Sequence, residues 1–172
     1  MSHLTRGIEI ERKLIIKKPD LALLSAMPEY RVSEIEQIYL LSEGNVTHRI
    51  RRRTFGDVTR CYETRKTRID KMSVIEDEGE ITGEEYESLK QKIAPETRPI
   101  YKTRHAFRYG ERVIEVDVYP EWDSCCILEV ELGSREEELM LPDFIEVVEE
   151  VTGVKGYSNA AMSRRFPPEP TI

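Results

Sequence analysis

The sequence has few cysteines and histidines and no long apolar run, and each scarcity excludes a class of protein. Cys61, Cys125 and Cys126 are odd in number and include an adjacent pair, so they form no disulfide framework. Their spacing relative to the three histidines does not match a zinc site. No segment approaches the roughly 18 apolar residues of a membrane span, and residues 1–13 contain no apolar signal core. We therefore expect a cytoplasmic protein with reduced thiols and no membrane partner.

The sequence also lacks a net positive charge. The 26 lysines and arginines are outnumbered by 33 aspartates and glutamates, which gives a net charge of −7. Proteins that coat nucleic acid carry the opposite balance, so we expect no nucleic-acid partner. A length of 172 residues is typical of one domain, and a hydrophobic share of 39% is enough for a core. We therefore expect a single domain over residues 1–172.

Alternation of apolar and polar residues is the dominant pattern, and it predicts β-strands. Turn signals rich in glycine, asparagine and aspartate separate several of these segments. Eight strands are predicted, at residues 7–17, 32–42, 46–54, 58–66, 72–81, 100–109, 112–119 and 126–132.

Helical signals are confined to three short segments. A short helix is predicted at residues 19–27, and Thr82 with Glu85 forms the capping box of a second helix. A last helix is predicted between Pro142 and Gly153. Its apolar residues fall on one helical face: Phe144, Ile145, Val148 and Val151.

Many strands with few helices indicate an α+β fold that is mainly β. We expect an eight-stranded antiparallel closed β-barrel with a few helices packed outside it. A two-sheet sandwich fits the same pattern of strands.

Charged side chains at alternate positions share one face of each predicted strand. That face has one sign of charge over whole strands, with acids on the first, fifth, seventh and eighth and bases on the third, fourth and sixth. One interpretation is a solvated outer face over an apolar core, as is usual for antiparallel sheets. The other is a charged interior, with the apolar faces turned outward beneath the helices. Segregation by sign is costly on an open face unless something binds there.

Acids and bases that converge on one cavity would form a metal–polyphosphate site. Carboxylates two residues apart on several strands can hold a hard divalent cation through oxygen. Rows of arginine and lysine can clamp phosphate oxygens, arginine through its planar fork.

The order of these charged pairs resembles the CYTH superfamily, the triphosphate tunnel metalloenzymes. The run from Glu9 to Lys13 resembles the ExExK signature of the family, and the later strands resemble its remaining motifs in order. These are Gln37-Ile-Tyr39, Arg49-Ile-Arg51, Thr64-Arg-Lys66, Glu76-Asp-Glu78, Lys102-Thr-Arg104, Glu115-Val-Asp117, Glu129-Val-Glu131 and Tyr157-Ser158-Asn159. The resemblance covers about residues 7–162, and we expect residues 163–172 to form a flexible tail.

The resemblance implies an eight-stranded tunnel with Mg²⁺ or Mn²⁺ as cofactor. It implies metal binding by a set of acids, namely Glu9, Glu11, Glu76, Glu78, Asp117, Glu129 and Glu131, with Glu115 as an alternative to Asp117. It implies a triphosphate cradle of Lys13, Arg49, Arg51, Lys66, Lys102 and Arg104. The residues expected to be catalytic are Glu9, Glu11, Lys13, Glu129 and Glu131. Strand parity turns Arg12 and Arg52 away from the tunnel. Residues 157–159 either close one mouth of the tunnel or contact phosphate.

The activity expected from this resemblance is metal-dependent hydrolysis of a triphosphate, with orthophosphate released by metal-activated water. The start of the chain most resembles small bacterial inorganic triphosphatases. Candidate substrates are the small molecules tripolyphosphate, ATP and thiamine triphosphate, and a homodimer is compatible with the sequence. Two alternatives stay open, a class IV-type adenylate cyclase and a non-catalytic polyphosphate- or nucleotide-binding module. The acidic strands argue against a pure anion binder.

Overall fold

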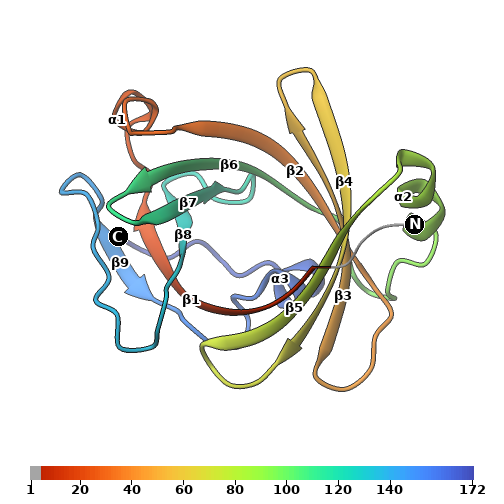
Figure 1. Ribbon diagram of the computed structural model, residues 1–172. Coiled ribbons are helices and arrows are strands. Elements are labelled where there is room, and N and C mark those ends of the chain that lie inside the picture. Colours follow the sequence, from red (N-terminus) through yellow and green to blue (C-terminus); the bar gives the residue numbers. More distant parts are fainter. Residues whose placement is uncertain (1–4) are drawn as a thin grey trace.

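The computed structural model describes residues 5–172, which form nine strands and three short helices (Figure 1). The strands are β1 (Thr5–Lys17), β2 (Arg31–Leu40), β3 (Val46–Phe55), β4 (Val58–Arg68), β5 (Ser73–Ile81), β6 (Ile100–Tyr109), β7 (Arg112–Val118), β8 (Cys125–Glu131) and β9 (Val147–Glu150). The helices are α1 (Leu21–Ser25), α2 (Gly83–Lys90) and α3 (Asn159–Arg164). The eight predicted strands are thus confirmed as β1 to β8.

Eight of the strands close into an antiparallel barrel. Neighbours follow the order β5, β4, β3, β2, β6, β7, β8 and β1, and β1 pairs with β5 to complete the circle. The pairing of Ile8 with Ile75 lies in this closing register. The predicted barrel is therefore confirmed, and the sandwich alternative is excluded because a sandwich leaves its sheets open.

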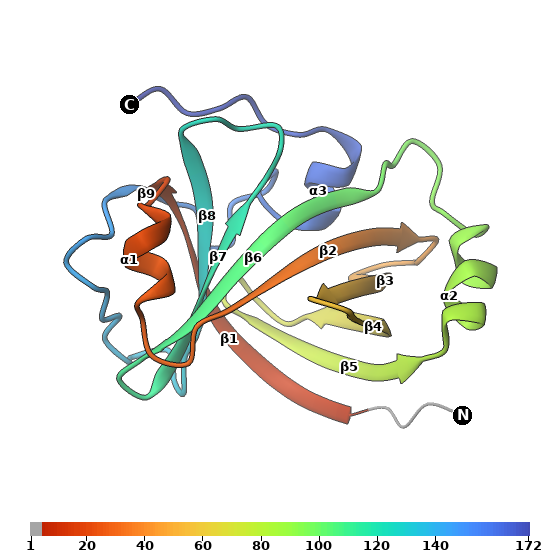
Figure 2. The ribbon, with the colours of Figure 1, turned by 90° about the horizontal axis from the view of Figure 1, so that it is seen from above.

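The apolar faces of β1, β7 and β8 turn outward, as the charged-interior interpretation requires. Leu14, Ile114 and Leu128 pack there with Leu24 of α1 and with Ile145 of the loop after β8. A second outer cluster lies under α2, where Tyr86 is fully buried against β2, β3 and β4. Figure 2 shows α1 and α2 at opposite ends of the molecule. Helix α2 carries the predicted capping box of Thr82 and Glu85.

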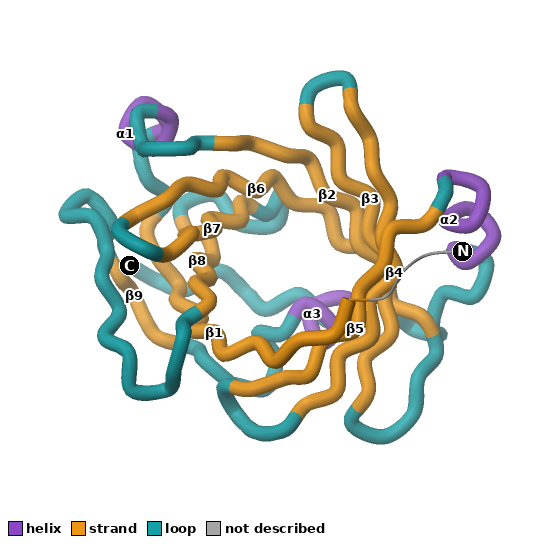
Figure 3. The backbone as a smooth tube through the Cα atoms, viewed as in Figure 1, coloured by secondary structure: helices purple, strands orange, loops and turns teal. Residues whose placement is uncertain are grey.

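One end of the barrel interior is apolar and covered by α3. Met162 of α3 packs with Ile15, Tyr39 and Ile127, which follow the charged positions along the inner faces of their strands. Figure 3 shows α3 across the far end of the barrel opening. Ser158 caps the helix by accepting a hydrogen bond from the Ala161 amide. Helix α3 had no clear signal in the sequence.

The predicted helix between Pro142 and Gly153 is wrong. Residues Val147–Glu150 instead form β9, which pairs with Leu14 to Ile16 of β1. The physical reason is that β5 pairs with β1 only as far as Ile10, so this edge of β1 would otherwise lack a partner. Branched Val147 and Val148 favour the extended backbone that covers the edge.

The expectation of a flexible tail at residues 163–172 also fails, because the tail packs on the barrel. The ring of Phe166 lies 5.3 Å from that of Tyr119 and 5.6 Å from that of Trp122, and Trp122 Nε1 donates to the Pro167 carbonyl. The Glu169 carboxylate accepts hydrogen bonds from three consecutive amides, those of residues 123–125. All three cysteines are buried and free. No helix within residues 5–172 is long and apolar enough to cross a membrane.

Truncation of the Phe166 side chain tests this packing. We expect Phe166→Ala to lower the free energy of unfolding by about 2 kcal/mol, because it removes a half-buried aromatic contact. Ile172→Ala is the control, since Ile172 is 60% exposed and should change stability by less than about 0.5 kcal/mol. Urea denaturation measures both values, and equal values for the two variants would mean that the tail is loose.

Candidate functional site

The barrel encloses a cavity of about 400 Å³ whose wall is mostly charged. Seven carboxylates and eight cations line it. The carboxylates are those of Glu9, Glu11, Glu76, Glu78, Glu115, Glu129 and Glu131. The cations are those of Lys13, Arg49, Arg51, Arg53, Lys66, Arg68, Lys102 and Arg104. Every residue of the predicted site except Asp117 therefore lines one cavity.

Strand parity explains this convergence, because residues two apart in a strand share a face. Arg49 and Arg51 point into the cavity, whereas Arg52 lies over the Tyr86 ring and pairs with Glu87 of α2. In the same way, the guanidinium of Arg12 pairs with Glu150 outside the barrel. The predicted outward direction of Arg12 and Arg52 is confirmed.

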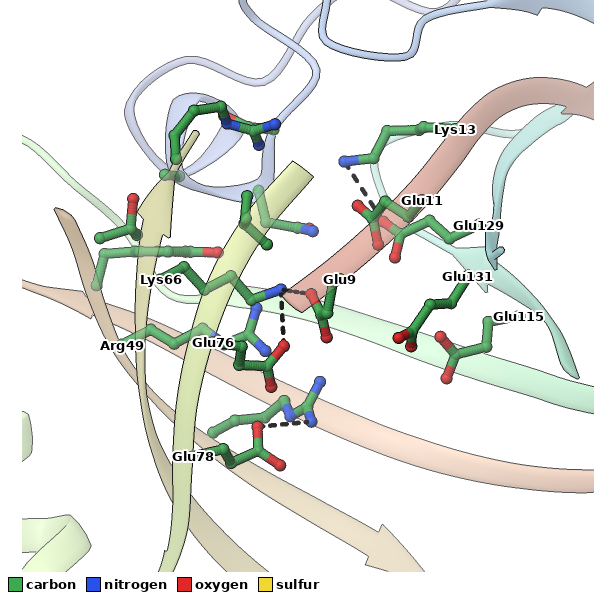
Figure 4. Close-up of a pocket in the computed structure, with 18 of the residues that line it drawn as sticks. Glu9, Glu11, Lys13, Arg49, Lys66, Glu76, Glu78, Glu115, Glu129 and Glu131 are labelled. Atoms are coloured by element: carbon green, nitrogen blue, oxygen red, sulfur yellow. Dashed lines mark hydrogen bonds and ion pairs between the residues drawn. The ribbon is translucent and has the colours of Figure 1, made fainter. Parts of the chain in front are cut away.

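The cavity is divided into a basic wall and an acidic wall. The cations of the basic wall come from β4, β3 and β6. Strand β2 lies between β3 and β6, so the four strands are consecutive around the barrel. The acidic wall is formed by β7, β8, β1 and β5, which complete the circle. Lys13 is the exception, since it lies on the acidic wall. Figure 4 shows Glu115, Glu129 and Glu131 grouped beside β1 and away from Arg49.

Two lysines hold the acidic wall together. Lys66 Nζ lies 3.1 Å from a carboxylate oxygen of Glu9 and 3.6 Å from one of Glu76, so it links β4 to β1 and β5 (Figure 4). Lys13 Nζ lies 3.4 Å from a carboxylate oxygen of Glu129. Burial alone would raise the pKa of Glu129, but Lys13 and Lys102 outweigh it and bring the pKa down to about 2.

Two acids have raised pKa values because they are buried beside other carboxylates. Burial and the neighbouring Glu129 raise the pKa of Glu11 to about 7. Burial and a hydrogen bond with Glu9 raise the pKa of Glu76 to about 8. The Oε2 atom of Glu76 is buried without a hydrogen-bond partner in the described part of the chain. The acidic wall thus holds more negative charge than its lysines compensate.

The basic wall has the opposite imbalance. The Nε atoms of Arg49, Arg51 and Arg53 are buried, and none has a hydrogen-bond partner among residues 5–172. Burial and the adjacent Arg49 lower the pKa of Arg51 to about 9, and Glu78, at 3.7 Å, only partly compensates. Donors held close together and lacking acceptors are the arrangement that a phosphate oxyanion satisfies.

Asp117 was expected to bind metal, but the structure buries it beside Lys102 and Arg104, and it is not among the residues that line the cavity. Its carboxylate is fully buried, 2.8 Å from Lys102 Nζ and within 2.7 and 2.9 Å of two nitrogens of Arg104. Burial opposes its ionisation, yet these two cations hold the pKa of Asp117 well below its usual range. Asp117 therefore orients Lys102 and Arg104 and does not face the cavity.

Sequence reasoning missed several residues that line the cavity. Arg53 shares the polar face of Arg49 and Arg51 in the sequence, but it lies outside the family motif and was not assigned to the site. Arg68 extends the basic row of β4 by one further alternate position, a signal that period-two counting could have supplied. Thr47 precedes Arg49 by two residues and shares its face, whereas Asn45 lies in the turn before β3, where strand periodicity does not apply. Residues 158–160, at the start of α3, also line the cavity.

The donor set suits a hard divalent cation, although no cage for one is preformed. Carboxylate oxygens are the ligands that Mg²⁺ and Mn²⁺ prefer. The crowding that raises the pKa values of Glu11 and Glu76 is the repulsion that a cation relieves. Within residues 5–172, however, no three acidic, histidine or cysteine side chains converge closely enough to form a metal site. Binding of a cation would therefore require the carboxylates to move away from Lys13 and Lys66.

Comparisons with known proteins agree with this fold. No protein-family model matches the sequence, and neither does any curated protein. Among solved structures, the inorganic triphosphatase NE1496 is 25% identical with a TM-score of 0.58, over 94% of this chain and 97% of that one. The PH1012 protein of Pyrococcus horikoshii OT3 is 17% identical with a TM-score of 0.57, over 74% and 80%. The bh2851 protein of Bacillus halodurans, named as a candidate adenylate cyclase, is 12% identical with a TM-score of 0.50, over 97% and 95%.

The last two structures show a shared fold only, whereas NE1496 matches almost the full length of both chains. A closed eight-stranded barrel with a divided charged interior defines the class of protein. The fold and the order of the strand motifs support the resemblance to the CYTH superfamily.

The raised pKa values of Glu11 and Glu76 make stability depend on pH. The folded protein retains these protons up to about pH 7 and about pH 8, whereas an ordinary glutamate releases its proton near 4.5. The folded state therefore binds more protons in this interval, and its stability falls as the pH rises through it. We expect Glu76→Gln to flatten this fall between about pH 5.5 and about pH 8 in urea denaturation of EDTA-treated protein.

Glu80→Gln is the matched control, because Glu80 is an exposed acid of the same strand that pairs with Arg60. This variant should keep the slope of the wild-type protein. If Glu76→Gln keeps that slope as well, Glu76 is not a buried, protonated carboxyl.

Proposed function

We propose that the protein hydrolyses a triphosphate with the help of a divalent metal ion, Mg²⁺ or Mn²⁺. The observation that carries the proposal is the division of one cavity into a basic wall and an acidic wall. The basic wall suits a triphosphate and the acidic wall suits a metal ion. A bound metal triphosphate would therefore neutralise the positive charge of one wall and the negative charge of the other. The name of NE1496 as an inorganic triphosphatase supports the same class of reaction.

Binding of the triphosphate falls to the basic wall. Arg49 and Arg51 supply planar donor groups, and Lys66, Lys102 and Arg104 supply further charge from the adjacent strands. Asp117 holds Lys102 Nζ and the Arg104 guanidinium in place, so these side chains lose little conformational entropy when the substrate binds. Lys13 completes the cradle from the opposite side.

The acidic wall would hold the metal through Glu9, Glu11, Glu129 and Glu131, with Glu76 and Glu78 as a second pair of carboxylates. When bound, the metal supplies charge neutralisation on the phosphate oxygens and activation of the attacking water. The side chains of the protein align the terminal phosphoryl group between the two walls and stabilise its negative charge.

In this reaction the oxygen of one water molecule bonds to the terminal phosphorus. The bond between that phosphorus and the bridging oxygen breaks, and its electron pair stays on the leaving pyrophosphate. One proton of the water leaves to solvent. The products of tripolyphosphate are therefore orthophosphate and pyrophosphate. No serine or cysteine nucleophile is needed for this direct displacement.

Inorganic tripolyphosphate is the substrate that the cavity wall favours. Of the described residues that line the cavity, Tyr39 is the only aromatic one. Its hydroxyl accepts a hydrogen bond from the Gln37 amide, and its ring is buried in the apolar end of the barrel. Since a base or thiazolium ring would gain from an aromatic surface, its scarcity favours a substrate without an organic group.

A substrate panel tests the proposal. We expect release of orthophosphate from tripolyphosphate with Mg²⁺ or Mn²⁺, slower release from ATP and thiamine triphosphate, and none after EDTA treatment. Pyrophosphate with cyclic AMP from ATP would instead identify a cyclase. Binding of all three compounds without any product would identify a non-catalytic module.

Arg51 and Arg52 form a matched pair because they are adjacent and face opposite sides of the barrel wall. Loss of one charge-assisted contact costs about 1.5–3 kcal/mol, so Arg51→Ala should weaken tripolyphosphate binding by roughly ten- to a hundredfold. Arg52→Ala removes the contacts with Tyr86 and Glu87 and should change stability but not binding. Isothermal titration calorimetry measures the affinities, and similar losses in both variants would refute the assigned basic wall.

A further inference from the structure

The charged cavity adjoins a seam in the barrel wall between β5 and β9. Strand β1 pairs with β5 as far as Ile10 and with β9 from Leu14 onward, so Glu11 to Lys13 lie between these two partners. At this seam a second cavity of about 260 Å³ lies between the loops 68–71 and 151–158. It shares Glu11, Lys13, Arg68 and Ser158 with the main cavity. We call this second cavity the side window.

Positive charge predominates in the side window. Its cations are those of Lys13, Arg68, Lys71 and Lys155, and its acids are Glu11 and Asp70. Asp70 is compensated from outside by an ion pair with Arg135. No carboxylate of residues 5–172 lies within ion-pair distance of Arg68, Lys71 or Lys155.

Both loops of the side window are held in place. The guanidinium of Arg68 donates to the carbonyl oxygens of Asp70 and Lys71, each at 3.1 Å. Gly153 has a φ of +67°, and a Cβ there would lie 2.9 Å from the Lys71 carbonyl oxygen. Lys13 Nζ donates to the Tyr157 carbonyl at 3.0 Å. The cations therefore surround a defined space.

The opposite end of the main cavity has the reverse charge. A third cavity there is lined by five carboxylates, those of Glu9, Glu76, Glu78, Glu80 and Glu131. No lysine or arginine among the described residues lines it. A polyanion that extends beyond the main cavity is thus repelled at this end and attracted at the side window.

We propose that the side window binds the phosphate units of a linear polyphosphate that is longer than three units. The inference rests on the proposed function, because it requires a triphosphate segment in the main cavity. The fourth unit then lies among Lys71, Lys155 and Arg68. The reaction with tetrapolyphosphate is the same displacement: water adds to the terminal phosphorus, the adjacent bridging bond breaks, and orthophosphate and tripolyphosphate leave with one proton released.

The experiment compares the double variant Lys71→Ala/Lys155→Ala with wild type on tripolyphosphate and tetrapolyphosphate. Because two exposed cationic contacts with the fourth phosphate unit are lost, kcat/KM for tetrapolyphosphate should fall by about three- to tenfold. The value for tripolyphosphate should stay within about twofold, because neither lysine lines the main cavity. Lys92→Ala, which removes an exposed lysine after α2, should alter neither substrate.

The two proposals fail in different ways. A wild-type protein that does not hydrolyse tripolyphosphate contradicts the proposed function, whatever the variant does. Equal changes for both substrates, or no change for either, overturn the side window as a chain-binding subsite. A variant that alters only inhibition by added inorganic phosphate also overturns it, since the window would then bind the product and not the chain.

Discussion

The buried ion pairs of Asp117 with Lys102 and Arg104 are the interaction on which the rest of the cavity depends. A lysine and an arginine cannot keep their charges inside a barrel without a partner, because desolvation costs several kcal/mol for each ion. Asp117 supplies that partner, and both cations still line the cavity. The barrel can thus present buried positive charge to an anion without collapsing around it.

The same constraint explains why the two walls are incompletely paired. A fully paired interior would be neutral and would gain little from binding a metal triphosphate. Here Lys66 and Lys13 link the acids only in part, and the arginine row of β3 keeps buried donors without acceptors. Burial, together with neighbouring groups of the same kind, raises the pKa of Glu76 and lowers the pKa of Arg51. Binding energy for substrate and metal is available because the fold leaves these charges unsatisfied.

Strand parity made most of the site predictable from the sequence. Alternation distinguishes Arg51 from Arg52 and Lys13 from Arg12, and the structure places each on the expected side. Parity gives the face but not the depth, however. Parity could not show that Asp117 is buried against Lys102 and Arg104 while Glu115 lines the cavity, because both residues share one face of β7.

The errors have the same origin in tertiary contacts. The segment before Gly153 has helical periodicity, yet the free edge of β1 draws it into β9. The tail after α3 is rich in proline, which predicts a loose segment, yet Trp122 and three consecutive amides bind it to the barrel. In each case the contact partner lies on another strand or more than 40 residues away in sequence, so a local sequence pattern cannot predict the contact.

Anomalous diffraction from crystals soaked with Mn²⁺ and tripolyphosphate tests the division of the cavity most directly. We expect manganese peaks among the carboxylates of β1 and β8, and tripolyphosphate density between those peaks and Arg49, Arg51 and Lys102. Manganese outside the barrel, or tripolyphosphate on its surface with the arginine row of β3 untouched, would contradict the two-wall arrangement as the basis of function.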